Sequence, residues 1–474
     1  MAMDAPPRTL NTSRRKKAYV ETYGCQMNLA DGELMQGILA AAEYDIVDAP
    51  EKADVILVNT CAIREHAEQR VYGRVGELSR IKQERPDVVI GVTGCMAQRL
   101  GEKIVQRAPY VDLVMGPDGY RTLPQVIGGI APAPAAPLSA RRGSLPVLSA
   151  AAAAQRTHLD FVAHENYEGL EIRRASKVTA WVPIQRGCNY RCTYCIVPYV
   201  RGSEKNRDPR HILDEVRNLV AEGVPEVVLL GQTVNSYEHG DWDFPRLLRE
   251  VARVDGVRRV RFTSPHPNDF TPQLVEVMAE EPTICKQLHL PVQSGHNRTL
   301  KRMLRRYTVE QYLEKIEMVR NAIPEIALST DIIVAFPGET RDEYEATLDL
   351  MRTVRFDDAF LYKYSPRDGT PATRLPAHEF VDEAEAQARL EQLIDLHRSI
   401  QAEINHAQVG RTVEVLIERV AKSAGDVLGR TDGNKVVAFF GDASRIGQFA
   451  KVLLTGTTGA TFSGAEIPDL VHVA

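Results

Sequence analysis

RGCNYRCTYCIVPYVRG, residues 186–202, places three cysteines within eight positions, at Cys188, Cys192 and Cys195. Closely spaced thiolates bind zinc or iron–sulfur clusters. A structural zinc ion needs a fourth ligand, and this stretch holds no further Cys or His. Three thiolates on a four-iron cluster leave one iron open for a small molecule that carries an amine and a carboxylate. The residues between the thiols are polar, which disfavours three reduced core cysteines.

The sequence around this segment alternates between apolar strands and helices. We expect six strands, at 178–187, 226–232, 258–264, 286–291, 327–336 and 358–365, with helices such as 211–223 and 341–354 between them. This alternation predicts a partial (β/α)6 barrel, in which the chemistry lies at the C-terminal ends of the strands. The cysteine segment follows the first of these strands.

Three further cysteines, Cys25, Cys61 and Cys95, share one local setting. Each follows an expected strand (17–24, 53–59 and 87–94) and precedes an expected helix. Strand–helix alternation predicts a doubly wound parallel α/β domain, so the three thiols fall at the same C-terminal edge of its sheet. Helix N-termini nearby favour the thiolate form. The alternative is three unrelated buried cysteines.

The rest of the chain supplies a linker and a third domain. Residues 131–160 are rich in Pro, Ala and Ser, which predicts a mobile linker with a short Ala-rich helix near 149–156. Short strands with Gly turns at 411–420, 435–441 and 449–456 predict a small antiparallel β-barrel.

Composition limits the class of protein. The net charge of −5 is small for 474 residues, and no stretch approaches 18 consecutive apolar residues, so we expect no membrane span. Seven cysteines without a secretory signal indicate the cytoplasm and metal binding or catalysis rather than disulfides. We interpret the seventh, Cys285, as a buried core thiol.

The CxxxCxxC spacing after the first barrel strand resembles the radical S-adenosylmethionine (SAM) superfamily. Its members hold a [4Fe-4S] cluster on three cysteines, and SAM chelates the fourth iron. Reductive cleavage of SAM then gives a 5′-deoxyadenosyl radical that abstracts hydrogen from an unreactive C–H bond.

Further motifs resemble the tRNA methylthiotransferases over roughly residues 17–470. Their N-terminal domain is matched by TYGCQMN (22–28), VNTCAIREHAEQRVYGRVGEL (58–78) and GCMAQR (94–99). Their radical SAM domain is matched by GQTVNSY (231–237), SPHPNDF (264–270), LHLPVQSG (288–295), STDIIVAFPGET (329–340) and YSPRDGTPA (364–372). VLGRTDGNKVVAFF (427–440) is similar to their TRAM domain, an RNA-binding β-barrel. Within the family the MiaB type is most similar.

The resemblance implies four segments: an N-terminal methylthiotransferase domain at 17–130, a linker at 131–175, a radical SAM domain at 176–407 and a TRAM domain at 408–474. It implies two [4Fe-4S] clusters, one on Cys188, Cys192 and Cys195 and one on Cys25, Cys61 and Cys95, the second carrying sulfur. The implied reaction adds a methylthio group to C2 of isopentenylated adenosine at position 37 of tRNA, with SAM as cofactor. No catalytic residue is expected beyond the cluster ligands.

Other contacts are expected from position in the motifs. We expect SAM to contact residues near the barrel mouth: Tyr194, Gln232, Ser264, Gln293 and Asp331. We expect tRNA to contact a basic group at helical spacing: Arg298, Lys301, Arg302, Arg305 and Arg306. A second basic group, Arg258, Arg259 and Arg261, is a weaker candidate, since charge runs are commonly solvated faces. Expected partners are a flavodoxin- or ferredoxin-like reductant and a sulfur donor or cluster-repair protein, and we expect a monomer.

Two alternatives remain at this point. One is methylthiolation of another adenosine modification or of an aspartate in a ribosomal protein. The other is a non-catalytic RNA-binding protein with structural zinc, which two sets of three cysteines at strand ends would serve poorly.

Overall fold

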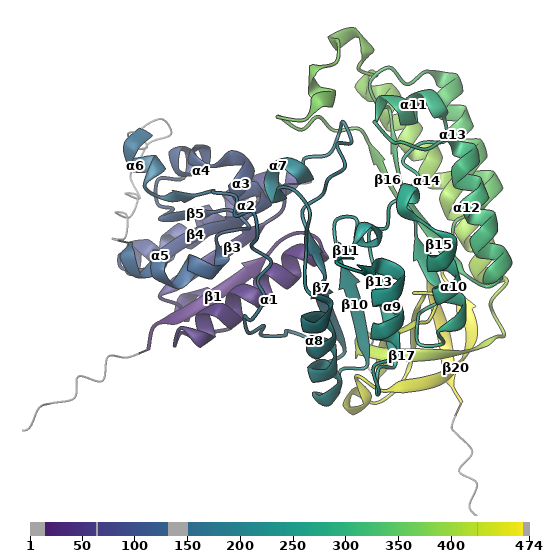
Figure 1. The fold of residues 1–474 in the computed structure, drawn as a ribbon, viewed down its shortest axis with the longest axis horizontal. Coiled ribbons are helices and arrows are strands. Elements are labelled where there is room, and N and C mark those ends of the chain that lie inside the picture. The colour runs from purple at the N-terminus through teal and green to yellow at the C-terminus, as the bar shows by residue number, and fades with distance from the viewer. Residues whose placement is uncertain (1–14, 63–64, 131–149, 424, 468–474) are drawn as a thin grey trace, which may run out of the picture. The chain divides into compact units, whose positions relative to one another are not determined.

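The structure is a computed structural model that describes residues 15–62, 65–130, 150–423 and 425–467 (Figure 1). The chain divides into two compact units. The N-terminal unit comprises the residues up to Val162 together with Gly169–Arg173, and the C-terminal unit comprises Ala163–Glu168 and the residues from Arg174 onward.

The N-terminal unit is built on a six-stranded sheet in which every neighbouring pair is parallel. In spatial order its strands are β2 (Asp45–Ile46), β1 (Lys17–Thr22), β3 (Val55–Thr60), β4 (Val89–Gly94), β5 (Leu113–Met115) and β6 (Thr157–His158). All residues of β3 and β4 are buried, which explains their unbroken Val and Ile runs. The doubly wound parallel domain predicted from the sequence is confirmed.

Helices cover both faces of this sheet (Figure 1). The helices α2 (Glu65–Glu84), α3 (Cys95–Leu100) and α4 (Glu102–Arg107) pack on one face through a core that includes Ile56, Val58, Ile90 and Val92. The other face carries α1 (Gln26–Ala41) and α5 (Leu123–Gly129). The helix α1 starts directly after Cys25, which agrees with the helix expected to follow this cysteine.

The predicted linker is only partly a linker. Its residues 131–149 lie outside the described part of the chain, while α6 (Ala150–Ala154) lies where the Ala-rich helix was predicted. The strand β6 follows and pairs in parallel with β5, so this segment completes the sheet. Residues 169–173 then contact α1, where a Cβ on Gly37 would come within 2.0 Å of the Glu171 carbonyl oxygen.

The C-terminal unit begins with six parallel strands, all predicted from the sequence. They form two three-stranded sheets, in the orders β13-β10-β7 and β14-β15-β16, joined by a bridge between Val260 and Ile284. Their bounds are β7 (Thr179–Pro183), β10 (Glu226–Leu230), β13 (Arg259–Phe262), β14 (Gln287–His289), β15 (Ala327–Val334) and β16 (Asp358–Lys363). This is the predicted partial barrel.

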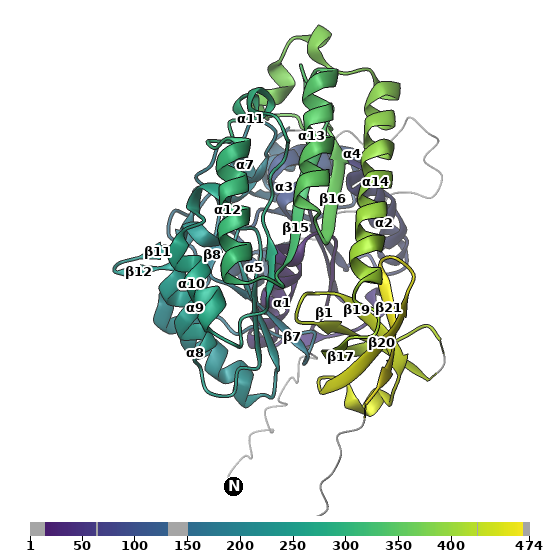
Figure 2. The same cartoon turned by 90° about the vertical axis from the view of Figure 1, so that its right-hand side faces the viewer.

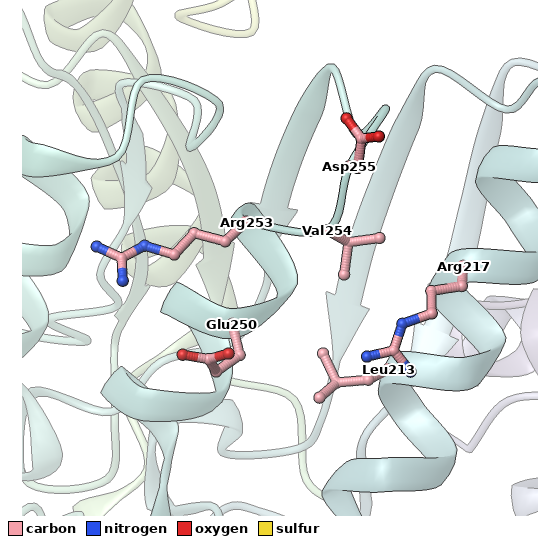
Figure 3. A pocket seen from close by; sticks show the side chains of 6 residues that line it. All are labelled: Leu213, Arg217, Glu250, Arg253, Val254 and Asp255. Atoms are coloured by element: carbon pink, nitrogen blue, oxygen red, sulfur yellow. The ribbon is translucent and has the colours of Figure 1, made fainter.

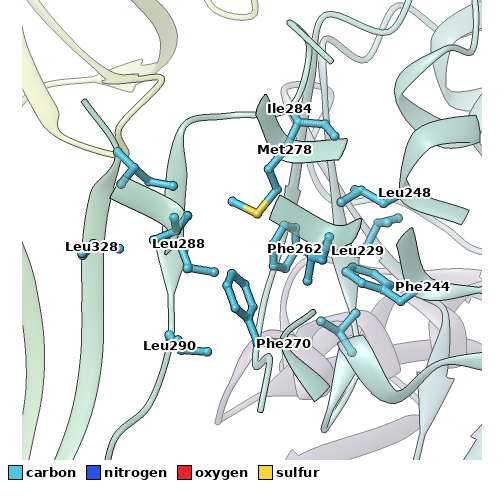
Figure 4. Close-up of a cluster of buried hydrophobic side chains, with 14 of the residues drawn as sticks. Leu229, Phe244, Leu248, Phe262, Phe270, Met278, Ile284, Leu288, Leu290 and Leu328 are labelled. Carbon is cyan, nitrogen blue, oxygen red and sulfur yellow. The ribbon is translucent and has the colours of Figure 1, made fainter. Parts of the chain in front are cut away.

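Helices surround these strands (Figure 2). They are α7 (Val197–Arg201), α8 (Pro209–Ala221), α9 (Phe244–Ala252), α10 (Pro272–Glu280), α11 (Asn297–Arg302), α12 (Val309–Ala322), α13 (Arg341–Val354) and α14 (Glu383–His406). Capping side chains fix where several begin: Thr308 and Thr340 each form a capping box, with Gln311 and Glu343 respectively. Side chains such as Phe244, Phe262 and Leu288 fill the space between helices and strands (Figure 4).

A small closed barrel follows α14. Its strands, in the order β17-β18-β19-β21-β20, are β17 (Thr412–Val420), β18 (Asp426–Thr431), β19 (Val436–Phe440), β20 (Phe449–Thr457) and β21 (Thr461–Glu466). The barrel was predicted to be antiparallel, and four of its pairings are, but β19 and β21 are parallel. The chain crosses the barrel as β20 before β21 returns beside β19, which gives these two strands the same direction.

Two arginines of β13 join this small barrel to the larger one. Arg261 donates to the carbonyl oxygens of Thr431 and Asp432, at 2.8 Å each, and forms an ion pair with the buried Glu226. Arg259 donates to the carbonyl oxygens of Glu414 and Arg430. Both are buried, so the weaker basic candidate group is mainly a contact between domains, and only Arg258 of that group is exposed.

Candidate functional site: two sets of three cysteines

The first set lies in the loop after β7. The short strands β8 (Gln185–Arg186) and β9 (Lys205–Asn206) pair antiparallel and hold the two ends of the loop together. Gly187 has a φ of +77°, and a Cβ there would come within 2.0 Å of the Ser203 carbonyl oxygen, so the close approach requires glycine. The loop is thereby fixed at the C-terminal end of the first barrel strand, as the sequence predicted.

The thiols of this loop lie in a largely buried environment. The Sγ of Cys188 lies 3.2 Å from the Thr233 hydroxyl, and Arg305 donates from Nη1 to the Sγ of Cys192 at 3.5 Å. Burial raises the pKa of Cys188 and raises that of Cys195 to about 12, with a smaller contribution from the neighbouring thiols. Cys188 and Cys195 are therefore protonated until a metal displaces the protons, as metal-binding thiols commonly are.

Across the described ranges, no three side chains of His, Cys, Asp or Glu converge closely enough to hold one metal ion. In a four-iron cluster each thiolate binds a different iron, so the sulfurs surround an inorganic core instead of meeting at one atom.

The residues expected to contact SAM follow the barrel strands. Gln232 comes after β10, and its buried Oε1 has no hydrogen-bond partner among the described residues. An unpaired buried acceptor is costly unless a ligand donates to it, and the ammonium group of an amino acid is such a donor. Three thiols and this acceptor therefore fit a cluster with bound SAM.

Two of the expected residues have strained backbones. Ser264 has a φ of +59° and Gln293 a φ of +74°, in a region that non-glycine residues rarely adopt outside functional sites. Gln293 is held there by backbone hydrogen bonds to Asp331 and Ile333, both 2.9 Å. The side chain of Asp331 projects from within β15 and lies 3.6 Å from Nε2 of His289.

The fifth expected residue, Tyr194, packs among apolar side chains. It contacts a small cluster formed by Met303, Phe336 and Ala372, and burial raises the pKa of its phenol. The side chain of Tyr194 is therefore packed in an apolar environment within the cysteine loop. The roles of all five residues toward SAM stay predictions.

His266 is a site residue that sequence reasoning did not single out. It is 5% exposed, its ring stacks on Tyr190 at 3.9 Å, and Tyr307 packs edge-on against it. Burial and the nearby Arg305 lower its pKa to about 2, so the ring is neutral. Its Nδ1 accepts from the Asn268 N–H, which leaves a protonated Nε2 with no partner among the described residues. The quoted segment SPHPNDF contained this histidine, but only its fold position shows that it faces the cysteine loop.

The second set of cysteines lies along one edge of the N-terminal sheet. Thr60 and Gly94, the last residues of β3 and β4, pair with each other, and the residue that follows each strand is a cysteine, Cys61 and Cys95. Cys25 is the N-cap of α1, after the neighbouring strand β1. A Cβ on Gly24 would come within 2.8 Å of the Cβ of Cys61, which places the first cysteine loop against the second. The three cysteines therefore follow adjacent strands at the C-terminal edge of the sheet, and their joint binding of one cluster stays a prediction.

Asparagines support this edge. The side chain of Asn28 accepts from the Cys25 thiol at 3.3 Å and donates to the Thr60 carbonyl oxygen at 3.2 Å. Asn59 donates in turn to the carbonyl oxygen of Asn28, and both side chains are fully buried. Oδ1 of Asn59 has no hydrogen-bond partner within the described residues.

The basic group expected to contact tRNA does not lie on one surface. Arg298 pairs with Glu343, Arg302 pairs with Glu379, and Arg305 is buried beside Cys192. Lys301 and Arg306 are exposed. The helix α11 ends at Arg302, and Leu304 has a φ of +56°, so the helical spacing assumed from the sequence does not extend to Arg305 and Arg306.

Two surface hollows flank the barrel. One, of about 280 Å³ (Figure 3), lies between α8 and α9 and is lined by Leu213, Arg217, Glu250, Arg253, Val254 and Asp255. These residues lie at the end of the barrel where the strands begin, away from the cysteine loop. The other, of about 380 Å³, lies beside the loop after β13 and includes Asn268, Arg306 and Tyr307.

Comparison with known proteins identifies the parts of the chain. The uncharacterized protein family UPF0004 matches residues 17–116, the radical SAM superfamily matches 182–351, and the TRAM domain matches 406–464. A curated tRNA-2-methylthio-N(6)-dimethylallyladenosine synthase of Moorella thermoacetica is 45% identical over 93% of this chain and 96% of its own length. The chain belongs to this family of radical SAM methylthiotransferases.

Other relatives agree over nearly the full length. Enzymes of the same name from Thermoanaerobacter sp. and Pelodictyon phaeoclathratiforme are 42% and 40% identical, over 98% and 97% of this chain and 95% and 100% of their own. As a radical SAM family member the chain uses a [4Fe-4S] cluster and SAM, and its TRAM domain is of an RNA-binding kind.

Solved structures share the fold. The radical SAM methyltransferase TsrM from Kitasatospora setae, determined with cobalamin and a [4Fe-4S] cluster, matches 76% of this chain and 74% of its own at a TM-score of 0.53 and 14% identity. The cobalamin-dependent SAM radical enzyme OxsB matches 81% of this chain and 58% of its own at a TM-score of 0.50 and 13% identity. At these identities the likeness concerns the fold alone.

No helix in the described part of the chain is both long and apolar enough to cross a bilayer.

Proposed function

We propose that this chain adds a methylthio group to C2 of isopentenylated adenosine at position 37 of tRNA. The observation that carries the proposal is the pair of three-cysteine sets, each at the C-terminal edge of parallel strands, in a chain whose relatives are named for this product. An aromatic C–H has no useful acidity, so a general base could not remove this hydrogen.

In the barrel, Cys188, Cys192 and Cys195 would hold the cluster, and Gln232 would accept a hydrogen bond from the amine of SAM. When bound, the cluster and SAM supply the radical that removes hydrogen from an unactivated C–H bond. The chain's own part is to position the cluster ligands and to exclude water from them. Thr233 and Arg305 contact the Sγ atoms of Cys188 and Cys192, and the thiol environment is largely buried.

In the N-terminal unit, Cys25, Cys61 and Cys95 would hold a second [4Fe-4S] cluster. Three ligands again leave one iron open, which suits a site that carries the sulfur to be transferred. Cys61 and Cys95 are buried and Cys25 is partly exposed, so a substrate could approach from the side of Cys25.

We infer tRNA contacts from Lys301 and Arg306, which are exposed, and from the TRAM barrel. Contacts of this kind to phosphates weaken as salt rises. A flavodoxin- or ferredoxin-like reductant and a sulfur donor or cluster-repair protein complete the proposed set of partners, and the chain would act as a monomer in the cytoplasm.

Mass spectrometry of tRNA nucleosides tests the reaction. A deletion strain should lose 2-methylthio-N6-isopentenyladenosine and accumulate the isopentenyl precursor, and the wild-type chain should restore it. Persistence of the methylthio product in the deletion strain would refute the assignment. Loss of a different methylthio product, on another modified adenosine or a ribosomal protein, would support the sister activity.

Iron and sulfide quantification after anaerobic purification tests the two clusters. Cys25→Ala and Cys188→Ala should each lose about half of the iron. Cys285→Ala is the matched control, because Cys285 is a buried thiol in the barrel core that lies in neither set. Zinc without iron in the wild-type protein would instead support the zinc-scaffold alternative.

A further inference from the structure

The guanidinium of Arg305 lies in the barrel against the sulfur of a proposed cluster ligand. Its three nitrogens make three different contacts: Nη1 with the Sγ of Cys192, Nε with the Tyr307 hydroxyl at 3.0 Å, and Nη2 with the Pro291 carbonyl oxygen at 3.1 Å. Only 8% of the residue is exposed. A buried cation without a carboxylate among these three contacts is costly, so a compensating negative group is expected nearby.

The backbone fixes this approach. Thr193, the residue after Cys192, donates from its N–H to the Met303 carbonyl oxygen and from its hydroxyl to the Arg302 carbonyl oxygen, at 3.1 and 3.0 Å. The Arg305 N–H donates to the Leu300 carbonyl oxygen across the turn that Leu304 makes. The cysteine loop and the Arg305 segment are therefore locked in one register, and the contact with Cys192 does not depend on a flexible surface side chain.

We propose that Arg305 is a positioning residue that donates a hydrogen bond to the cluster thiolate of Cys192 and thereby raises the reduction potential of the barrel cluster. The inference rests on the assignment of Cys188, Cys192 and Cys195 as cluster ligands.

The direction follows from electrostatics. Reduction adds one electron to the cluster, and a nearby cation with an N–H donor stabilises the more negative state. Potentials of iron–sulfur clusters depend on net charge, on hydrogen bonds to the sulfurs and on solvent exposure, and Arg305 acts on all three. Burial strengthens the effect because water cannot screen it.

The test is a redox titration of the cluster followed by electron paramagnetic resonance, with dithionite as the electron donor. It uses the full-length chain carrying Cys25→Ala, Cys61→Ala and Cys95→Ala, so that the proposed second cluster does not contribute. In this parent, Arg305→Gln should shift the reduction equilibrium at least about tenfold toward the oxidised cluster, which is about 59 mV for a one-electron couple. Arg305→Lys keeps the positive charge but not the forked arrangement of N–H donors, and it should shift the reduction equilibrium less than Arg305→Gln does.

Arg306→Gln is the matched control, because it removes the same charge one residue further on, from an exposed side chain. Its potential should equal that of the parent. An Arg305→Gln variant with full iron content and the parent's potential would overturn the proposal. If that variant loses iron, Arg305→Met decides, because it also removes the charge and the donors while keeping a long side chain, and an unchanged potential there would overturn the proposal equally.

The outcome separates this proposal from the assignment on which it rests. A parent that contains no iron, or whose signal does not change when SAM is added, would refute the cluster ligands themselves. A parent with a SAM-sensitive cluster and an unshifted Arg305→Gln variant would refute only the role of Arg305.

Discussion

Asn59 and Asn28 are joined across the cysteine edge of the N-terminal sheet: Nδ2 of Asn59 donates to the carbonyl oxygen of Asn28 at 2.8 Å, although 31 residues separate them in sequence. Asn28 in turn contacts the thiol of Cys25 and the carbonyl oxygen of Thr60. The two asparagines therefore tie the loop of Cys25 to the strand that leads to Cys61.

Replacing Asn28 should loosen this edge. Asn28→Ala removes the two side-chain hydrogen bonds and leaves a buried carbonyl oxygen unpaired, which should lower the free energy of unfolding by about 1–3 kcal/mol. The variant should also lose iron from the N-terminal set while the barrel retains its own. Anaerobic iron quantification and urea unfolding measure the two effects. Leu29→Ala, at an exposed position of the same helix, is the control, and equal iron in both variants would contradict the supporting role.

A buried ion pair stabilises the same unit. Lys82 of α2 pairs with Asp112, which also accepts from the Ile90 N–H of β4 at 2.8 Å, and both side chains are almost fully buried. Lys82→Met should cost about 3–5 kcal/mol, because it leaves the carboxylate buried without its cation. Adding Asp112→Asn should recover part of this loss. Lys52→Met, which breaks an exposed pair with Asp48, should change urea unfolding little. A Lys82 variant as stable as the Lys52 variant would be inconsistent with this account.

Glu339 should make stability depend on pH. Burial raises its pKa from 4.5 to about 7, despite opposing contacts from the Ala335 N–H and Arg389. Since the folded pKa lies above the unfolded one, the folded state binds the proton more tightly. The stabilising contribution of protonated Glu339 to the free energy of unfolding is fully present below about pH 4.5. It is lost as the pH rises through about 7, and the total loss is about 3 kcal/mol.

Urea unfolding of the wild type and of Glu339→Gln at pH 5 and pH 8 measures this contribution. The wild type should lose more stability over this range than the variant, which cannot ionise. Glu345→Gln, at a half-exposed position of α13, which begins two residues after Glu339, should behave as the wild type. Parallel pH profiles for the wild type and Glu339→Gln would rule out the predicted linkage.

Arg261 should hold the TRAM barrel in place. Arg261→Ala removes two hydrogen bonds to the barrel's carbonyl oxygens and leaves Glu226 buried without its partner. Trypsin should then cleave near Arg411 and release the small barrel faster than in the wild type. Arg258→Ala, three residues earlier and exposed, is the matched control. Identical cleavage rates in the two variants would mean that the domains are joined mainly by other contacts.

The placement of the cysteines could be predicted from the sequence because parallel strands all end at the same edge of a sheet. Knowing that Cys25, Cys61 and Cys95 each follow a strand was enough to place them at one edge of the sheet. The buried position of the Arg305 side chain could not be predicted in this way. Helical spacing assigns Arg305 and Arg306 to positions on a helix, but the positive φ of Leu304 ends that helix, and one side chain turns inward and the other outward.

The contacts of the β13 arginines and of His266 could not be predicted from the sequence either, because they depend on residues that are distant along the chain. The pattern of charges in 258–261 shows that arginines alternate along a strand, but not that a distant domain supplies their acceptors. The unpaired Nε2 of His266 depends on the packing of Tyr190 and Tyr307, which lie 76 and 41 residues away in sequence. The predicted boundaries at 130, 175 and 407 stay predictions.

The parallel closure of the TRAM barrel sets the order of events during synthesis. The last strand, β21, pairs with both β19 and β20, so a nascent chain that has reached Thr457 carries four strands with two open edges. Open edges pair readily with other chains. This domain therefore cannot finish folding on the ribosome before residues 461–466 have been translated, and premature termination just upstream would yield an aggregation-prone product rather than a merely shortened one.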